Sequence, residues 1–191
     1  MKPKLRNDAV SPVIGIMLML VVTIIIAAVV SAFGSGMIDS QAKTPQAKIG
    51  ATFSVSQGMT ITHDGGDAIP LDSIVFITQH GPGFGPSTEP FAEVLNTSII
   101  ADEDGNQVFL TSSTGGKSSF NPGDTLYIST DNCSMEMLQP GLYKTSKTSF
   151  SGGAITALKY QRTQNVGKTF ILKVNDKDGN LISTCEVKIT S

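Results

Sequence analysis

The strongest constraint on this chain is an apolar run close to its N-terminus. The 21 residues from Val13 to Phe33 carry no charge, and only Gly15, Thr23 and Ser31 interrupt large apolar side chains and alanines. As an α-helix rising about 1.5 Å per residue, the run would be roughly 31 Å long, which matches the hydrocarbon core of a bilayer. A helix that is apolar on every face cannot be left in water, so it must lie in lipid or against other apolar helices.

Charged residues flank this run unevenly. Lys2, Lys4 and Arg6 precede it, and no basic residue follows until Lys43. Because Lys and Arg accumulate on the cytoplasmic side of a membrane, we expect the N-terminus inside and the rest of the chain outside. The part beyond Ala9 carries 15 acidic and 11 basic residues without a basic cluster. We therefore expect no nucleic-acid partner.

The residues alone leave three interpretations of the apolar run open. A secretory signal would be cut after it, and Val30-Ser31-Ala32 offers the small residues that such a cut requires, although the run is longer than usual. A permanent single-pass anchor would keep the whole segment. A signal cut before the run would leave the helix on the mature protein. Ser11-Pro12 is a good helix start for the last two, since Ser can cap the helix and Pro fits its first turn.

The N-terminal residues resemble a known family. The segment RNDAVSPVIGIMLMLVVTIIIAAVVSAFG is similar to the N-terminus of archaeal type IV pilins, which have a short basic leader and a Ser-Pro-Val-Ile-Gly opening of the helix. The segment ITHDGGDAIPL, residues 61–71, also resembles part of these pilins. The resemblance implies a class III signal peptide that a prepilin peptidase cuts between Ala9 and Val10.

One position departs from the pattern of bacterial type IV pilins. Those proteins place a glutamate at the fifth mature residue, where it pairs with the N-terminal amine of a neighbouring subunit. The corresponding residue here is Ile14. Helices of this chain would therefore have to find their register by packing.

Small residues recur along the run at intervals of four, as Thr23, Ala27, Ser31 and Ser35 and, beside them, as Ala28, Ala32 and Gly36. Such rows let helix backbones approach closely in an apolar environment. We expect a helix-packing surface that comprises Gly15, Thr23, Ala27, Ala28, Ser31 and Ala32. The alternative is a chance pattern in a segment rich in Ala and Val.

The rest of the chain is organised differently. We expect a leader at 1–9, a transmembrane or filament-core helix at 10–36, a linker at 37–48 and an extracellular β domain at 49–191. Short alternating runs rich in Val, Ile, Thr and Phe predict strands at 50–56, 59–63, 73–79, 98–101, 107–111, 124–130, 154–160, 168–175 and 181–190. The predicted fold class is α+β, with the long helix followed by an antiparallel, immunoglobulin-like β-sandwich.

Three acidic segments could be taken for metal sites, but turns explain them better. The ligand spacing in His63-Asp64-Gly65-Gly66-Asp67 matches no usual metal geometry. The segments 102–106 and 176–180 resemble calcium loops, yet their twelfth positions hold Ser113 and Val187, which cannot chelate as a glutamate does. Asp104-Gly105 and Asp178-Gly179 instead predict tight hairpin turns. We expect neither a metal nor a cofactor.

Two further residue pairs are candidates for modification. Cys133 and Cys185 would form a disulfide that closes a loop of about 52 residues in an oxidising compartment, and the alternative is two buried free thiols. Asn96 and Asn132 each begin an Asn-x-Ser sequon, so either could carry a glycan on an outward-facing domain.

No nucleophile motif, phosphate-binding glycine loop or pair of acid–base carboxylates is evident, so we do not expect an enzyme. The resemblance implies a structural subunit of an archaeal type IV pilus-like filament, held in the cell membrane as a precursor and then assembled at the surface with identical or related pilins. Its β domain would serve adhesion or surface contact. The alternative is a membrane-anchored extracellular binding domain that does not polymerise.

Overall fold

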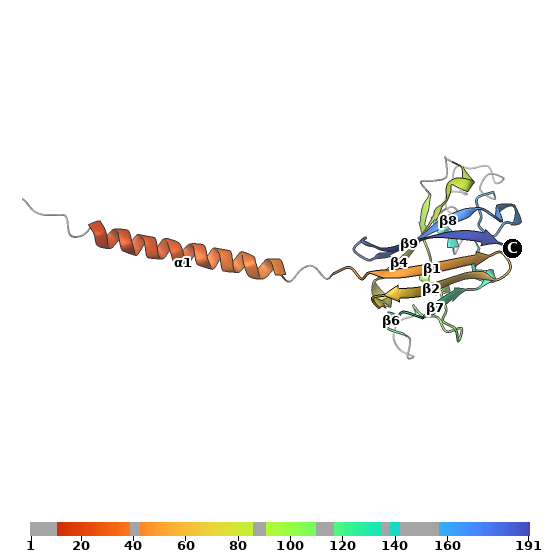
Figure 1. Cartoon of the computed structure of the whole chain (residues 1–191), viewed down its shortest axis with the longest axis horizontal. Coiled ribbons are helices and arrows are strands. Elements are labelled where there is room, and N and C mark those ends of the chain that lie inside the picture. The colour runs from red at the N-terminus through yellow and green to blue at the C-terminus, as the bar shows by residue number, and fades with distance from the viewer. Residues whose placement is uncertain (1–10, 39–42, 86–90, 110–116, 135–137, 142–156) are drawn as a thin grey trace, which may run out of the picture. The chain divides into compact units, whose positions relative to one another are not determined.

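The computed structural model describes residues 11–38, 43–85, 91–109, 117–134, 138–141 and 157–191 (Figure 1). The chain divides into two compact units, residues 1–43 and 44–191. The first contains a single long helix, and the second contains the β-strands. The α+β class predicted from the sequence is therefore confirmed.

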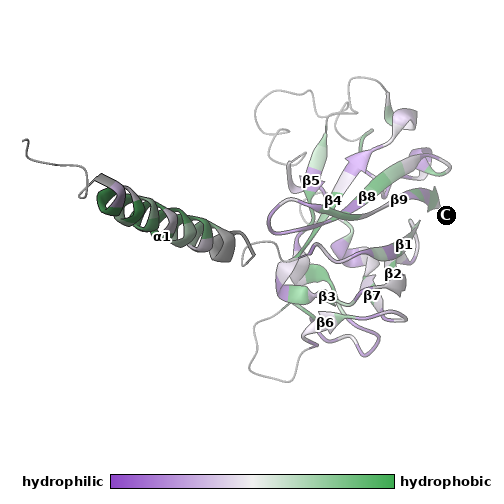
Figure 2. Cartoon of the chain, turned by 60° about the vertical axis from the view of Figure 1, so that its left-hand side comes forward, coloured by the Kyte–Doolittle hydropathy of each residue, from purple (hydrophilic) through white to green (hydrophobic). Residues whose placement is uncertain are grey.

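Helix α1 (Ser11–Ile38) contains the whole apolar run. It begins at Ser11-Pro12, and no further proline interrupts it. Thr23 is accommodated within the helix because its hydroxyl donates to the carbonyl oxygen of Leu20 at 2.8 Å. Figure 2 shows hydrophobic colour along the helix, and the described side chains from Pro12 to Phe33 are all exposed.

The second unit is built mainly from one curled sheet with the strand order β5-β4-β8-β9-β1-β2-β7, and a separate ribbon pairs β3 with β6. The strands are β1 (Ala47–Ser54), β2 (Gly58–Gly66), β3 (Ile69–Pro70), β4 (Ile74–His80), β5 (Ala92–Val94), β6 (Ser119–Phe120), β7 (Thr125–Ile128), β8 (Thr169–Asp176) and β9 (Leu181–Thr190). Short 3₁₀ turns connect them, including η3 (Thr97–Ile99) and η4 (Thr130–Asn132).

Pairing within the sheet is antiparallel except at one place. Strands β1 and β9 run parallel, with Phe53 opposite Ile189 and Ser54 opposite Thr190. This short contact joins the antiparallel group β5-β4-β8-β9 to the antiparallel group β1-β2-β7, so that hydrogen bonds connect all seven strands (Figure 1). The structure does not confirm the predicted immunoglobulin-like sandwich of two separate facing sheets.

The core lies against one face of the curled sheet. Buried and partly exposed residues alternate along β4 and β8, as the period-2 geometry of a strand requires. Aromatic rings fill the centre of the core. The rings of Tyr160 and Phe170 stack with a centroid separation of 4.2 Å, and the ring of Phe53 meets that of Phe170 edge-on at 5.8 Å. Phe53 comes from β1 and Phe170 from β8, so this aromatic cluster packs together the two groups that β1 and β9 join.

Three predicted strands are wrong. In the described part of 107–111, Gln107 forms only an isolated bridge with Ala101, and residues 108–109 form a turn. Residues 98–101 were expected to be extended, but Thr97–Ile99 forms turn η3, because the Asn96 side chain accepts a hydrogen bond from the backbone N–H of Ser98. The described part of the predicted strand 154–160 consists of turn and irregular backbone. Asn165 holds this stretch by donating from its side-chain amide to the carbonyl oxygens of Ala157 and Lys159.

Both predicted Asp-Gly turns are confirmed, and they share one hydrogen-bond pattern. In each, the first Asp carboxylate accepts the backbone N–H of an Asn four residues on, at 2.8 Å for Asp102–Asn106 and 2.8 Å for Asp176–Asn180. The glycines adopt φ of 80° at Gly105 and 88° at Gly179. Since the carboxylates bind their own turns, these segments are structural hairpins.

We predict that acid weakens both turns. The Asn106 backbone N–H lowers the pKa of Asp102, and the Asn180 side-chain amide lowers the pKa of Asp176. A carboxyl whose pKa is lower in the folded protein stabilises it above the unfolded pKa of about 3.9, and this contribution disappears as the pH falls through the folded value. Carbon-13 NMR titration of the chain in detergent micelles should therefore give midpoints below 3.9 for both carboxyls. Midpoints at or above 3.9 would contradict the proposed turn chemistry.

Candidate functional site

Helix α1 exposes an apolar surface in every direction. Fifteen of its large hydrophobic side chains are exposed, and their exposed fractions range from 43% at Val22 to 72% at Phe33. Burying a side chain of this size is worth about 1.5–3 kcal/mol, so leaving all of them in water would cost on the order of tens of kcal/mol. By length and composition, Pro12–Phe33 is sufficient to cross a membrane. The helix therefore requires apolar surroundings.

The six predicted packing residues, Gly15, Thr23, Ala27, Ala28, Ser31 and Ala32, all lie on α1, and all are exposed. An added Cβ at Gly15 would meet nothing within 4 Å. The structure therefore leaves this surface open to an approaching helix. The predicted cleavage residues Ala9 and Val10 lie outside the described residues.

The segment His63–Asp67 holds the start of strand β1. Asp67 binds Gln46 in two ways, because its backbone N–H donates to the Gln46 carbonyl oxygen at 2.8 Å and its carboxylate accepts the Gln46 N–H at 3.1 Å. Gln46 directly precedes β1, so these bonds fix the point at which the chain enters the domain. We call His63–Asp67 together with Gln46 the β1 clamp.

His63 supports the clamp from the core side. Its side chain is only 2% exposed, its Nε2 lies 3.0 Å from the Asp67 carbonyl oxygen, and its ring meets Phe120 edge-on at 5.1 Å. Nε2 must carry the proton to donate this bond. Among the described residues, no group of three His, Cys, Asp or Glu side chains could hold a metal ion. The contacts of His63 are those of a structural brace.

Two adjacent glycines in the clamp have different surroundings. Gly65 has φ of 148° and Gly66 has φ of 107°, which side chains rarely tolerate. A Cβ at Gly66 would collide with the backbone of Gln46 and Ala47, whereas a Cβ at Gly65 would meet nothing within 4 Å. Gly66 therefore permits the close approach of β1, whereas Gly65 pairs with Lys48 beside a register shift and has open space around it. The turn predicted over residues 63–67 is wrong for residues 63–66, which belong to strand β2.

We predict that Gly66→Ala destabilises the domain more than Gly65→Ala. Both substitutions introduce backbone strain of about 1–2 kcal/mol, and only the first adds a steric collision, worth about 1–3 kcal/mol more. Thermal unfolding of each full-chain variant in detergent micelles, followed by near-ultraviolet circular dichroism, would measure the difference. Equal losses from the two variants would show that close packing against Gln46 is unimportant.

The two cysteines are free thiols. Cys133 follows η4, is 3% exposed and donates weakly to the Ile128 carbonyl oxygen at 3.8 Å. Cys185 lies on β9 opposite Leu172 and is partly buried. Burial raises the pKa of both thiols to about 11, so both are protonated at neutral pH. The thiols are free in the structure, and a Cys133–Cys185 disulfide stays a prediction for the chain in an oxidising compartment.

The two sequon asparagines lie in different settings. Asn96 is exposed before η3, and its side-chain oxygen accepts from the backbone N–H and the hydroxyl of Ser98, the third residue of its own sequon. Asn132 is partly exposed at the end of η4, beside a pocket. Glycosylation at either residue stays a prediction.

Sequence reasoning did not identify the role of Gln46. No property of this residue distinguishes it from other polar residues of the predicted linker, because its function depends on backbone atoms. The only available signal was the glycine pair Gly65-Gly66, which indicates that some backbone approaches closely.

Comparison with known proteins identifies the N-terminal part of the chain. Residues 8–49 match the family model described as archaeal type IV pilin, N-terminal. The match includes all of α1 and ends within β1. No curated protein matches the chain. The resemblance of the N-terminal residues to archaeal type IV pilins is therefore confirmed.

Proposed function

We propose that this chain, an archaeal type IV pilin by its N-terminal segment, assembles into a surface filament as a structural subunit. Its α1 helices would form the filament core, and its β domain would be displayed outside for adhesion or surface contact. The family is one of structural subunits, which agrees with the absence of a catalytic motif from the sequence.

The observation that carries this proposal is the exposed, uncharged surface of α1. Its side chains from Pro12 to Phe33 are exposed on all sides of the helix. A bilayer can cover such a surface before assembly, and the same helices of neighbouring subunits can cover it afterwards. Exchange of lipid for sister helices keeps the apolar area out of water at every stage.

Packing between these helices would rely on shape and not on charge. Ile14 occupies the position at which bacterial type IV pilins have a pairing glutamate, and α1 contains no charged residue. The rows of small residues allow close backbone contact, which gives van der Waals packing a defined register. We infer that the partners of this chain are identical or related pilins.

The precursor would lie in the cell membrane with its basic N-terminus inside and its β domain outside. Lys2, Lys4 and Arg6 favour this orientation. A prepilin peptidase would then cut between Ala9 and Val10 at the cytoplasmic face. The mature protein would retain the complete helix.

We predict that the mature protein begins at Val10. Peptide mass analysis of protein sheared from cells should give Val10 as the first residue, because the resemblance to archaeal type IV pilins implies a cut between Ala9 and Val10. Met1 as the first residue would support the alternative of a permanent anchor that does not polymerise. A first residue of Phe33 would mean that the helix is discarded, which would exclude a filament core made of α1.

We also predict that the double substitution Ala27→Leu, Ser31→Leu prevents filament assembly without preventing membrane insertion. Each added side chain would hold neighbouring helices apart, at a cost of about 1–3 kcal/mol per contact. Electron microscopy of sheared material measures assembly, and membrane fractionation measures insertion.

The matched control is Ile25→Leu, Val29→Leu. These residues have the same spacing but lie two positions away, which places them on the opposite side of a helix with 3.6 residues per turn. The control should assemble normally because it keeps large apolar side chains where large side chains already occur. Normal filaments from the Ala27, Ser31 variant would contradict packing through the small-residue rows.

A further inference from the structure

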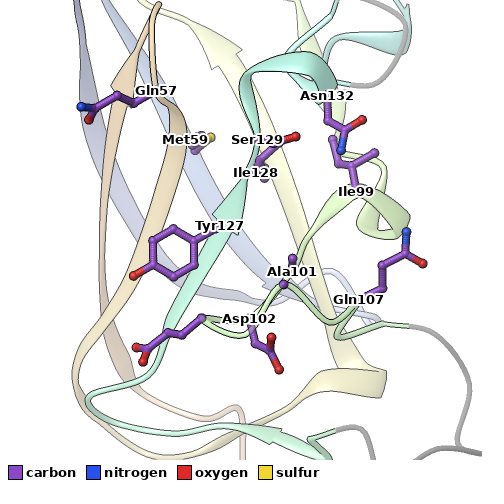
Figure 3. A pocket seen from close by; sticks show the side chains of 12 residues that line it. Gln57, Met59, Ile99, Ala101, Asp102, Gln107, Tyr127, Ile128, Ser129 and Asn132 are labelled. Atoms are coloured by element: carbon purple, nitrogen blue, oxygen red, sulfur yellow. The ribbon is translucent and has the colours of Figure 1, made fainter.

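A pocket of about 450 Å³ lies beside strand β7 and opens to solvent. Its walls come from the β1–β2 turn, from η3 and η4, and from the hairpin at residues 101–107. Figure 3 shows the Tyr127 ring on one side of the strand and the Asn132 and Gln107 side chains on the other. This volume is within the range of sites that hold small organic ligands.

The lining of the pocket combines one exposed aromatic ring with buried apolar side chains. Tyr127 is 39% exposed, and its side chain is the most exposed aromatic one among the described residues of the β domain. Met59, Ile99 and Ile128 also line the pocket and are at most 6% exposed. The accessible ring of Tyr127 can therefore stack on the C–H face of a flat, partly apolar ligand.

The rim of the pocket carries neutral amide side chains and two negatively charged carboxylates. The amides of Gln57, Gln107 and Asn132 each provide a donor and an acceptor, and the carboxylates of Asp102 and Glu103 provide strong acceptors. No basic residue lines the pocket among the described residues. These groups suit a ligand rich in hydroxyls, and their charge disfavours an anion.

The site is held in place before any ligand arrives. Backbone hydrogen bonds join Tyr127 to Ala101 in both directions, at 2.8 and 2.9 Å, and Tyr127 also pairs with Thr60 of β2. The Asp102 carboxylate is fixed by the N–H groups of Asp104 and Asn106. Binding would therefore cost little ordering of the protein.

We propose that this pocket binds a neutral glycan, with a sugar ring stacked on Tyr127 and its hydroxyls bonded to the surrounding amides and carboxylates. The proposal rests on the proposed function, because a displayed domain meets the glycans of other surfaces. A filament repeats the site along its length, so weak single contacts would combine into strong attachment.

Two sources could supply the glycan: another surface, or a glycan attached to Asn132 at the pocket's own rim. The variant Asn132→Gln removes the sequon and distinguishes them. Binding of an added sugar by wild-type protein supports the external source. Binding only after Asn132→Gln supports the pocket chemistry with the chain's own glycan as its occupant.

The test is saturation-transfer NMR on the full chain in a zwitterionic detergent, because sugar detergents would compete. The neutral probes are cellobiose, mannobiose and N,N′-diacetylchitobiose, and digalacturonic acid is the anionic probe. At least one neutral probe should bind, and Tyr127→Ala should weaken its binding by roughly tenfold, while Tyr127→Phe should keep it within roughly threefold. The control Leu181→Ala changes an exposed side chain on β9, outside the pocket lining, and should not alter binding.

Three results would overturn the glycan site: no neutral probe binds in either Asn132 background, digalacturonic acid binds as tightly as the neutral probes, or Tyr127→Ala binds like wild type. Loss of filaments in a folded Tyr127→Ala variant would also overturn it, since the pocket would then be a contact between copies of the chain. Wild-type protein that binds a neutral sugar but never forms filaments would instead overturn the proposed function and leave the glycan site standing.

Discussion

The rest of this molecule depends on the exclusion of water from α1. Each part of the chain fits that requirement. In the proposed function, the basic residues at the N-terminus would orient the helix in a membrane, and its uncharged surface would let it leave lipid for other helices. The β domain buries a core of its own.

Much of the fold could be predicted from the sequence because the controlling signals are local. A continuous apolar run predicts α1, and alternation predicts β4, β8 and β9, where strand and burial periods agree. The error at residues 98–101 arose because an Asn side chain competes with strand pairing there. The parallel contact between Phe53 and Ile189 could not be predicted, since it joins residues far apart in the sequence and gives no periodic signal of its own.

The candidate sites also differ in whether they depend on local sequence or on the folded sheet. Candidate helix-packing residues could be proposed from the sequence because spacing along one helix determines which residues share a face, and their role stays a prediction. The pocket at Tyr127 could not, because its lining comes from the β1–β2 turn, the 101–107 hairpin, β7 and η4, which only the folded sheet brings together. The sequence also leaves open whether Cys133 and Cys185 form a disulfide, and both thiols are free in the structure.

The position of β1 explains why its first residues are held so closely. Any force carried along the chain from α1 enters the domain at Gln46 and passes into β1, which lies between β9 and β2 in the sheet. Pulling on β1 along its length loads its pairing with β2 in shear, so that many hydrogen bonds must fail together. The bonds between Gln46 and Asp67 prevent the end of the strand from peeling away first. The β1 clamp thus secures the first strand of the domain when the preceding chain is pulled.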